Sequence, residues 1–412
     1  MNAPGNAETA SFADLGVAAD LVAALAEVGI MSPFPIQVLA IPDALAGRDV
    51  CGQAQTGSGK TVAFGIPLVE RAGLARPECP TGLVLVPTRE LCVQVAAEVG
   101  RLAAARGLGL VAVYGGASMS RQVQELKRAS IVVATPGRLL DLAERRHLSL
   151  ADVAVVVIDE ADQMADMGFL PQVHAVMRLV EGQTQTMLFS ATLDGAVGAL
   201  VRSYMKAPVR FEADAGGEVA EAQSHRFIQV HYMDKARLVA AITAGVSRAL
   251  IFVGTKRNAE RVASDLRGEG VKVAALHGDR RQEDREKALR GFADGSLPVL
   301  VATNVAARGL HIDDVDVVIH YDPPQDFKSF IHRSGRTARA GETGLVVTLV
   351  EWDQIAEVQR LQRASGLHQE IVKMLSNDPR LADLASFRPD RVEFKRESDA
   401  DLSRRAGRRR RR

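Results

Sequence analysis

The same short apolar segments occur twice in this chain of 412 residues, and that repetition constrains its fold more than any other feature. Residues 83–89 (LVLVPTR) resemble residues 250–256 (LIFVGTK), 167 positions later. Residues 131–135 (IVVAT) resemble residues 299–303 (VLVAT), 168 positions later. Isolated Val/Ile runs recur in many α/β proteins, but several matches at one spacing favour tandem duplication.

The repeated apolar runs are each followed by sequence typical of a helix. Continuous apolar runs suit parallel strands that are buried on both faces, and amphipathic stretches at residues 90–102 and 257–266 complete βαβ units. A looser match joins Tyr114-Gly-Gly to His277-Gly-Asp at a similar spacing. A single hydrophobic core stops growing near about 250–300 residues. We therefore predict an α/β fold with parallel sheets in two similar domains.

Breaks in the periodic pattern indicate where these domains end. The first domain is expected over residues 1–206 and the second over residues 225–366. A linker is expected at 207–224, where Pro208 and a Gly-Gly pair interrupt the pattern. Residues 367–412 are too short and polar to hold a core of their own, so we expect a basic, disordered tail there.

Charge is unevenly distributed along the chain. Lys and Arg number 51 against 50 Asp and Glu, a formal net charge of +1, which alone speaks weakly against a nucleic-acid partner. Seven of the basic residues are arginines within residues 404–412, so residues 1–403 carry a net charge of −6. The arginine run is either a solubilising end or a non-specific tether for nucleic acid.

Other features of the sequence bear on the compartment. No stretch approaches the roughly 18 consecutive apolar residues that cross a bilayer, and the first residues lack the basic start and apolar core of a secretion signal. The three cysteines form no CxxC pair. We expect a cytoplasmic protein with no membrane association.

A phosphate-binding loop is predicted in the first half, at residues 54–61 (AQTGSGKT), with Ala54 in place of the usual first glycine. Glycines let the backbone wrap around phosphate oxygens, and the start of the following helix presents free N–H groups. Lys60 is expected to reach the β- and γ-phosphates and the Thr61 hydroxyl to bind Mg²⁺. A glycine-rich turn before a helix is the alternative. The predicted nucleotide-binding residues of the loop are Ala54, Gln55, Thr56, Gly57, Ser58, Gly59, Lys60 and Thr61.

An acidic cluster, Asp159-Glu-Ala-Asp162, follows the apolar run at residues 153–158. The carboxyl ends of parallel strands are where α/β sheets bind ligands. We assign Asp159 to the metal ion and Glu160 to the attacking water. Acidic residues also favour the first turn of any helix, but an apolar strand that runs directly into this cluster makes that explanation weaker.

The second half lacks a GK[ST] loop but contains residues 332–339 (HRSGRTAR). If this segment is helical, Arg336 and Arg339 face similar directions. They are candidates for the arginine-finger role, which stabilises charge on the transferring γ-phosphoryl group. A solvated basic face is the alternative.

Together these segments resemble the DEAD-box family of ATP-dependent RNA helicases, over roughly residues 12–366. The resemblance rests on the order and spacing of ten motifs, at Phe12, 29–37, 54–61, 87–90, 115–116, 135–138, 159–162, 190–192, 303–309 and 332–339. It implies two RecA-like domains, ATP and Mg²⁺ as cofactors, RNA as the partner of a monomer, and local, largely sequence-independent unwinding.

The resemblance also assigns roles to individual residues. It implies that Gln37 reads adenine through its amide, and that Phe12, Gly309 and the residue at position 311 help to bind the nucleotide. Ser190, Thr192, Asp162 and His332 would link hydrolysis to unwinding. The implied RNA contacts, mostly to phosphate and sugar, are Pro87, Thr88, Arg89, Gly116, Thr135, Pro136, Gly137, Arg138, Thr255, Gln282, Arg285 and Thr303. A threonine at the end of a strand is also an ordinary helix cap.

The chain departs from the family pattern at four positions. Ile30 and Phe34 stand where the family usually has an aromatic residue and a threonine, so adenine is expected to pack on an aliphatic surface. Asn304 and His311 stand where the family commonly has aspartates. His311 loses the charge-assisted bond that a carboxylate makes to the ribose, so we hypothesise weakened ATP-dependent closure.

Two alternatives to an RNA helicase remain open. A DNA-directed helicase or translocase would share the two-domain core, although Gln37 and the intact Asp159–Asp162 cluster argue against it. An RNA clamp or annealing chaperone with weakened ATP coupling is the other alternative. Asn304 and His311 favour the chaperone, whereas Lys60 and Glu160 argue against it.

Overall fold

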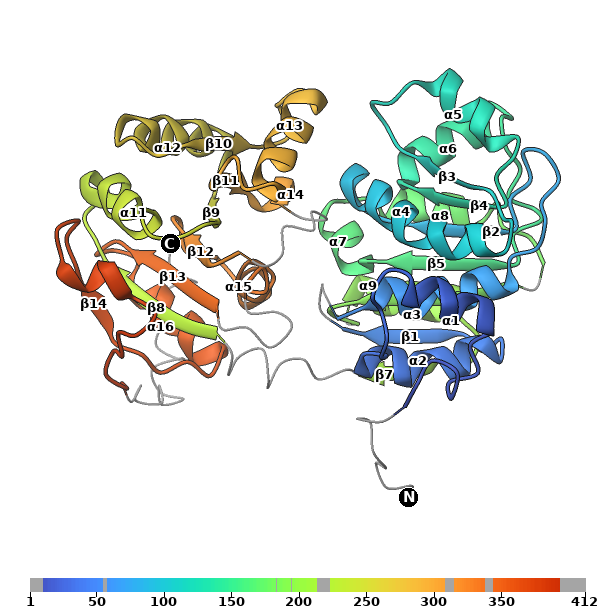
Figure 1. Cartoon of the computed structure of the whole chain (residues 1–412), viewed down its shortest axis with the longest axis horizontal. Helices are drawn as coiled ribbons and strands as arrows, with labels where there is room; N and C mark the ends of the chain where they lie inside the picture. The colour runs from blue at the N-terminus through green and yellow to red at the C-terminus, as the bar shows by residue number, and fades with distance from the viewer. Residues whose placement is uncertain are drawn as a thin grey trace, which may run out of the picture. The chain divides into compact units, whose positions relative to one another are not determined.

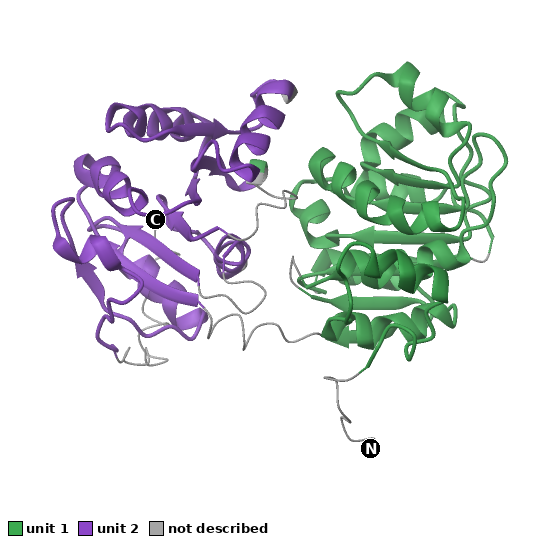
Figure 2. Cartoon of the chain, in the orientation of Figure 1, with its two compact units in different colours: residues 1–220, 306–313 green, residues 221–305, 314–412 purple. Residues whose placement is uncertain are grey.

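The computed structural model describes residues 10–54, 58–182, 184–193, 195–212, 223–307, 315–337 and 344–392. Figure 2 colours the two compact units into which the chain divides. Of the described residues, the first unit holds those in 10–212 together with 306–307, and the second holds those in 223–305 and 315–392. This division confirms the prediction of two domains.

The first unit is built on a seven-stranded parallel sheet in the order β3-β4-β2-β5-β6-β1-β7 (Figure 1). Its strands are β1 (Val50–Gln53), β2 (Gly82–Leu85), β3 (Leu110–Val113), β4 (Ile131–Ala134), β5 (Val155–Asp159), β6 (Gln185–Ser190) and β7 (Val209–Glu212). Its helices are α1 (Ala19–Ala26), α2 (Pro35–Leu45), α3 (Lys60–Arg71), α4 (Arg89–Ala105), α5 (Met119–Leu126), α6 (Pro136–Glu144), α7 (Ala161–Asp166), α8 (Leu170–Met177) and α9 (Gly195–Tyr204).

The second unit has a parallel sheet in the order β10-β11-β9-β12-β13-β8-β14. Its strands are β8 (Gln223–Gln229), β9 (Ala249–Val253), β10 (Val273–Leu276), β11 (Val299–Thr303), β12 (Val317–His320), β13 (Gly344–Val350) and β14 (Ile371–Lys373). Its helices are α11 (Lys235–Thr243), α12 (Lys256–Gly268), α13 (Gln282–Ala293), α14 (Asn304–Ala307), α15 (Phe327–Ser334) and α16 (Ile355–Ala364), with 3₁₀ turns η1 (Tyr232–Asp234) and η2 (Pro379–Asp383).

The two sheets have the same strand order, position by position. The repeated segments found in the sequence occupy equivalent strands, β2 with β9 and β4 with β11, and the looser match falls on the ends of β3 and β10. This agreement confirms that the two halves repeat one architecture. Residues of the two units can therefore be compared through the strands they follow.

Both faces of the first sheet are covered by helices. Strand residues such as Val84 and Val157 pack with α1 to α4 on one face, whereas Leu83 and Ile158 pack with α5 to α9 on the other. Each of these strand residues is at most 1% exposed. Burial on both faces explains why the strands appear in the sequence as continuous apolar runs rather than alternating ones.

Both expected domain boundaries on either side of the linker were misplaced by a few residues. β7 pairs with β1, so the first sheet continues past residue 206, and β8 begins at Gln223, inside the expected linker. Pro208 did mark a break in the helical pattern, but the chain continues from it into an edge strand rather than out of the domain. Short edge strands leave little periodic signal in a sequence.

The expectation that the tail starts at residue 367 was also wrong. β14 pairs with β8, and Met374, Leu381 and Leu384 are buried in the core of the second unit. Arg226 holds this segment by donating to the carbonyl oxygens of Leu384 and Ala385, both at 2.9 Å. The segment needs no core of its own because it adds to an existing one. Residues 393–412, with the arginine run, lie outside the described residues.

Within the described part of the chain, no helix is long and apolar enough to cross a membrane.

Candidate functional site

The predicted phosphate loop lies between β1 and α3, with Lys60 as the first residue of the helix. Lys60 is only 7% exposed, and its Nζ donates to the carbonyl oxygen of Ala54 at 3.0 Å. Gly59 has a φ of 83°, and a Cβ there would overlap the Gln37 amide. Glycine is therefore required at this position for both its backbone angle and its lack of a side chain. Gln55, Thr56 and Gly57 lie outside the described residues.

Asp159 and Glu160 lie at the carboxyl end of β5, as the acidic cluster predicts. Asp159 is 3% exposed, and its Oδ1 accepts from the backbone N of Glu160 at 2.9 Å. Burial raises the pKa of Asp159 to about 7, against the opposing effect of the Lys60 charge. Burying a lone carboxylate is costly, and a cation bound beside it would offset that cost.

Glu160 has a left-handed backbone, with a φ of 51°. This conformation is unfavourable for a residue with a side chain, by roughly 1–3 kcal/mol. Glu160 precedes the first residue of α7, so the strained turn lets β5 pass directly into that helix. Such strain is typical of residues that the fold holds in place for chemistry.

One cavity of about 370 Å³ joins these groups in the first unit. Lys60, Thr61, Asp159 and Glu160 line its polar part. Its apolar lining includes the aliphatic residues Leu25, Val28, Ile30 and Leu102 together with the aromatic Phe34. Phe12 does not line this cavity; it is 2% exposed and belongs to the core cluster beneath α1 to α4.

Gln37 lies in the same cavity, but its amide is engaged by the protein itself. Oε1 accepts from the backbone N of Phe34 at 2.8 Å, and Nε2 donates to the carbonyl oxygen of Gly59 at 2.9 Å. Gln37 thus connects the start of α2 to the phosphate loop. To read adenine, the amide would exchange at least one of these bonds.

Three of the predicted coupling residues meet in one hydrogen-bond chain. The backbone N of Asp162 donates to the Ser190 hydroxyl at 3.2 Å, and that hydroxyl donates to the carbonyl oxygen of Thr192 at 2.7 Å. The end of β6 is therefore tied directly to the helix that follows Glu160. The fourth coupling residue, His332, is in the last turn of α15 in the second unit.

The predicted RNA contacts of the first unit gather at the carboxyl ends of three adjacent strands. Thr88 and Arg89 follow β2, Gly116 follows β3, and Thr135 follows β4. Pro87 precedes Thr88, and Pro136, Gly137 and Arg138 form the first turn of α6. The Thr88 hydroxyl also caps α4 by accepting from the backbone N of Leu91, so its cap role is real.

The left-handed backbone explains the glycine at position 116. Gly116 has a φ of 87°, and a Cβ there would overlap the Arg89 guanidinium. Arg138 lies on the other side of this turn, where its Nη1 donates to the carbonyl oxygen of Ala117 at 3.3 Å. The two arginines therefore flank the turn that follows β3.

The predicted RNA contacts of the second unit occupy the equivalent places. Thr255 follows β9, Thr303 ends β11, and Arg285 is in the first turns of α13, which follows β10. Thr255 caps α12 by accepting from the backbone N of Asn258 at 3.1 Å, as Thr88 caps α4. Gln282 is the first residue of α13, and its side chain lies outside the described part.

The helical arrangement considered for Arg336 and Arg339 is wrong for Arg336. α15 ends at Ser334 and is capped by Gly335, so Arg336 lies beyond the helix. Glycine terminates helices readily, and the HRSGR sequence contains such a stop signal. Arg336 is 3% exposed, which argues against a solvated basic face. Arg339, Gly309 and His311 lie outside the described residues.

Two buried cations of the second unit were missed by the sequence reasoning. Arg333 is 5% exposed; it donates to Asn304 Oδ1 at 2.6 Å and to the carbonyl oxygen of Asp322 at 2.8 Å. Lys235 is 2% exposed, donates to the carbonyl oxygen of Tyr321 at 2.9 Å and pairs with Glu351 at 2.8 Å. Arg333 could have been found, because it lies within the motif at residues 332–339. Lys235 belongs to no motif, so the sequence offered no signal for it.

Comparisons with known proteins agree with this geometry. Residues 34–199 match the family model described as DEAD/DEAH box helicase, and residues 234–341 match the helicase conserved C-terminal domain. The DEAD-box ATP-dependent RNA helicase CshA of Streptococcus pneumoniae is 42% identical over 89% of this chain and 70% of the relative. CshA of Geobacillus kaustophilus is 36% identical over 88% of this chain and 78% of the relative.

A plant relative and a solved structure extend the likeness. The mitochondrial DEAD-box ATP-dependent RNA helicase 9 of Arabidopsis thaliana is 37% identical over 89% of this chain, which spans 61% of that longer relative. A structure of S. cerevisiae Dbp5 bound to RNA and ADP BeF3 is 29% identical, with a TM-score of 0.81, and covers 90% of this chain and 97% of its own. With both family models matched and these relatives aligned over most of its length, the chain belongs to the DEAD-box family of ATP-dependent RNA helicases.

Proposed function

We propose that this protein hydrolyses ATP to ADP and phosphate in response to RNA, and uses that cycle to clamp and locally unwind short RNA duplexes. The observation that carries the proposal is the single cavity lined by Lys60, Thr61, Asp159 and Glu160. A phosphate-binding lysine, a hydroxyl and two carboxylates are the groups that phosphoryl transfer to water requires.

Within this cavity each residue has a distinct role. Lys60 turns from the carbonyl oxygen of Ala54 to the β- and γ-phosphates, since both are acceptors for its ammonium group. Glu160 orients the attacking water and takes up its proton. Gln37 reads the adenine edge, and the aliphatic groups of Ile30 and Leu25 pack against the ring.

Asp159 and Thr61 fit Mg²⁺. Magnesium binds through one or two carboxylates together with substrate phosphates and waters. Among the described residues, no group of three or more His, Cys, Asp or Glu side chains is arranged to hold a metal ion by itself. The buried Asp159 carboxyl, with its raised pKa, is stabilised as an anion by such a cation. When bound, the ion neutralises charge that develops on the phosphates.

RNA contacts from equivalent strand ends of the two units support sequence-independent binding. Hydroxyls, backbone amides at helix starts and arginines recognise phosphate and sugar rather than base edges. Bending of one strand of a duplex then needs no particular sequence. The second unit also contributes to nucleotide binding and hydrolysis, through Arg336, Arg339, Gly309 and His311. Hydrolysis is coupled to unwinding by Ser190, Thr192, Asp162 and His332. We place this activity in the cytoplasm and expect a monomer.

A second candidate function is an RNA clamp or annealing chaperone with weakened ATP coupling. The specific observation in its favour is Asn304, whose neutral amide oxygen, in place of a carboxylate, accepts from the buried Arg333. A carboxylate at this position would pair its charge with the Arg333 guanidinium, which a neutral amide oxygen does not do.

The Glu160→Gln variant separates the two functions. For an ATP-driven helicase we expect RNA-stimulated ATPase to fall by about 10²–10⁴-fold, and multiple-turnover unwinding of a short RNA duplex to be lost with it. Binding of ATP and RNA should persist, because the amide keeps the shape of the side chain. A chaperone would keep full strand-annealing and strand-separating activity in the variant. Stimulation of the wild-type ATPase by DNA as strongly as by RNA would instead support a DNA-directed enzyme.

A further inference from the structure

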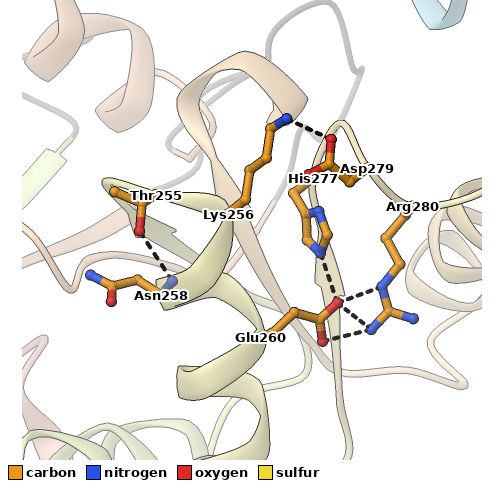
Figure 3. Close-up of polar contacts among 7 residues, drawn as sticks. All are labelled: Thr255, Lys256, Asn258, Glu260, His277, Asp279 and Arg280. Carbon is orange, nitrogen blue, oxygen red and sulfur yellow. Dashed lines mark hydrogen bonds and ion pairs between the residues drawn. The ribbon is translucent and has the colours of Figure 1, made fainter.

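A cluster of charged side chains connects α12 to the turn that follows β10 (Figure 3). Glu260, in the middle of α12, is at its centre. Its carboxylate accepts from His277 Nε2 at 2.7 Å, and from Arg280 Nε and Nη2 at 2.7 and 2.8 Å. A carboxylate that receives two parallel bonds from one guanidinium fixes the orientation of that group as well as its distance.

A second ion pair holds the same turn. Lys256 Nζ lies 2.6 Å from Asp279 Oδ1, and Lys256 and Glu260 are four residues apart, so both face the turn from the same side of α12 (Figure 3). The backbone N of Arg280 donates to the carbonyl oxygen of His277 at 3.2 Å, which closes the turn. The turn is thus tied to α12 at His277, Asp279 and Arg280.

The two ion pairs differ in how far they are protected from water. Lys256 and Asp279 are 56% and 67% exposed, whereas His277 is 8% exposed and Arg280 35%. Exposed pairs contribute little because water and salt screen them. Glu260 is itself 42% exposed, but one of its partners is a buried imidazole, so it is the better protected of the two connections.

The position of this turn gives the cluster its significance. α13 begins at Gln282, two residues after Arg280, and α12 begins directly after Thr255. RNA contacts are proposed at both helix starts. Glu260 therefore links the segment after β9 to the segment after β10. These are two of the three places in the second unit where RNA contacts are proposed.

The first unit holds its equivalent turn differently. Gln122 Nε2 donates to the carbonyl oxygen of Tyr114 at 3.0 Å, and Arg138 donates to that of Ala117. The residue in α4 that corresponds to Glu260 is Val93, which is 48% exposed. The carboxylate is therefore a feature of the second unit and not a general requirement of the repeated fold.

We propose that Glu260 is a positioning residue for RNA binding: by holding His277 and Arg280, it sets the direction of the first turn of α13, from which Arg285 contacts the RNA backbone. The proposal rests on the proposed function. It assigns Glu260 no contact with RNA or ATP. Supporting residues of this kind act by keeping contacting groups within a fraction of an ångström of their productive geometry.

The test compares Glu260→Ala and Glu260→Gln with the wild type in the full chain. We measure the concentration of single-stranded poly-uridine RNA that half-saturates the ATPase, kcat at saturating RNA, and binding of a fluorescent ATP analogue without RNA. Loss of the carboxylate should raise the half-saturating RNA concentration by about tenfold, with kcat and ATP binding within about twofold. The half-saturating RNA concentration of Glu260→Gln should lie between those of the wild type and Glu260→Ala, because the amide oxygen still accepts one bond.

Glu269→Ala is the matched control. Glu269 caps the other end of α12, is 38% exposed against 42% for Glu260, and pairs with Arg237 at 3.4 Å. This variant should leave the half-saturating RNA concentration unchanged. A general loss of folding would change RNA affinity, kcat and ATP binding together. A positioning role would change RNA affinity alone, and Glu260→Gln would partly restore it.

Three outcomes would overturn the proposal. The first is a half-saturating RNA concentration in Glu260→Ala equal to that of the wild type. The second is an equal effect of Glu269→Ala. The third is a parallel loss of RNA affinity, kcat and ATP binding in Glu260→Gln. A wild-type ATPase that RNA does not stimulate would overturn the proposed function itself, and is recognised before any variant is made.

Discussion

Lys235 occupies in the second sheet the place that Lys60 occupies in the first. Each is the first residue of the helix that follows equivalent strands, α11 after β8 and α3 after β1. Lys60 lines a cavity beside Asp159, whereas Lys235 is paired with Glu351 and donates to the Tyr321 carbonyl oxygen. The second unit thus holds its lysine in an ion pair at the place where the first unit has the lysine of its predicted phosphate loop.

Glu351→Ala should destabilise the second unit without creating a second nucleotide site. The variant leaves the buried Lys235 ammonium without its ion-pair partner, which costs roughly 2–3 kcal/mol given that Glu351 is itself 29% exposed. The single tryptophan, Trp352, is 77% exposed in the folded protein, so urea unfolding is followed by circular dichroism rather than by its fluorescence. An unchanged urea midpoint, or a second bound nucleotide per chain, would contradict this explanation.

The pH dependence of ATP hydrolysis should follow Asp159. Its pKa is raised to about 7, chiefly by burial, so kcat/KM for ATP should rise with pH through an apparent pKa near 7 as the metal-binding carboxylate forms. The same raised pKa means that ionisation of Asp159 destabilises the folded protein. This destabilisation is absent below the unfolded pKa near 3.9, and it grows with pH until the pH passes 7. Rate measurements from pH 5.5 to 8.5 test this, and a flat profile would count against Asp159.

Asn304→Asp should strengthen the hold on Arg333. The guanidinium of Arg333 now donates to a neutral amide oxygen at 2.6 Å. With Asp the acceptor would carry the opposite charge, and we expect about 1 kcal/mol of added stability for the second unit. Urea unfolding followed by circular dichroism again gives the measurement. Asn304→Ala is the opposing control and is expected to lower stability. If both variants unfold at the same urea concentration as the wild type, this bond does not matter.

Asp279→Asn should tighten RNA binding. Lys256 is paired with Asp279 in this structure, and removal of the carboxylate would leave its charge available to a phosphate, with a gain of roughly threefold in affinity and a salt slope steeper by about one. Asp265→Asn is the control, because Asp265 pairs with Arg261 farther along α12. Fluorescence anisotropy of labelled single-stranded RNA at several salt concentrations measures both quantities, and weaker binding in Asp279→Asn would refute the prediction.

Deletion of residues 404–412 should weaken RNA binding and reduce its salt dependence. Seven arginines in contact with a single strand contribute a salt slope of about 5. We expect ATPase at saturating RNA to stay unchanged, because the nucleotide cavity lies in the first unit. If the truncated protein binds RNA with wild-type affinity and salt slope, the run is a solubilising end only.

Much of the fold could be predicted because its signals are local. The apolar runs that became β2, β4, β9 and β11 are visible in the sequence, since strands buried on both faces need no alternation. Strand β14 was missed, because three residues on a sheet edge leave no periodic pattern. The acidic cluster after β5 was found for a similar reason: the strand and its carboxylates adjoin in the chain.

The sequence by itself determined the duplication, the order of the motifs and the residue types of the nucleotide site, because each depends on neighbours along the chain or on a repeated spacing. Only the tertiary structure decided which of these groups are engaged by the protein. Glu351, the partner of Lys235, lies 116 residues farther along the chain, and His277, the partner of Glu260, follows the next strand. The Gln37 amide is bonded across the loop to Gly59. Contacts of that kind depend on how strands and helices pack, and no local pattern encodes them.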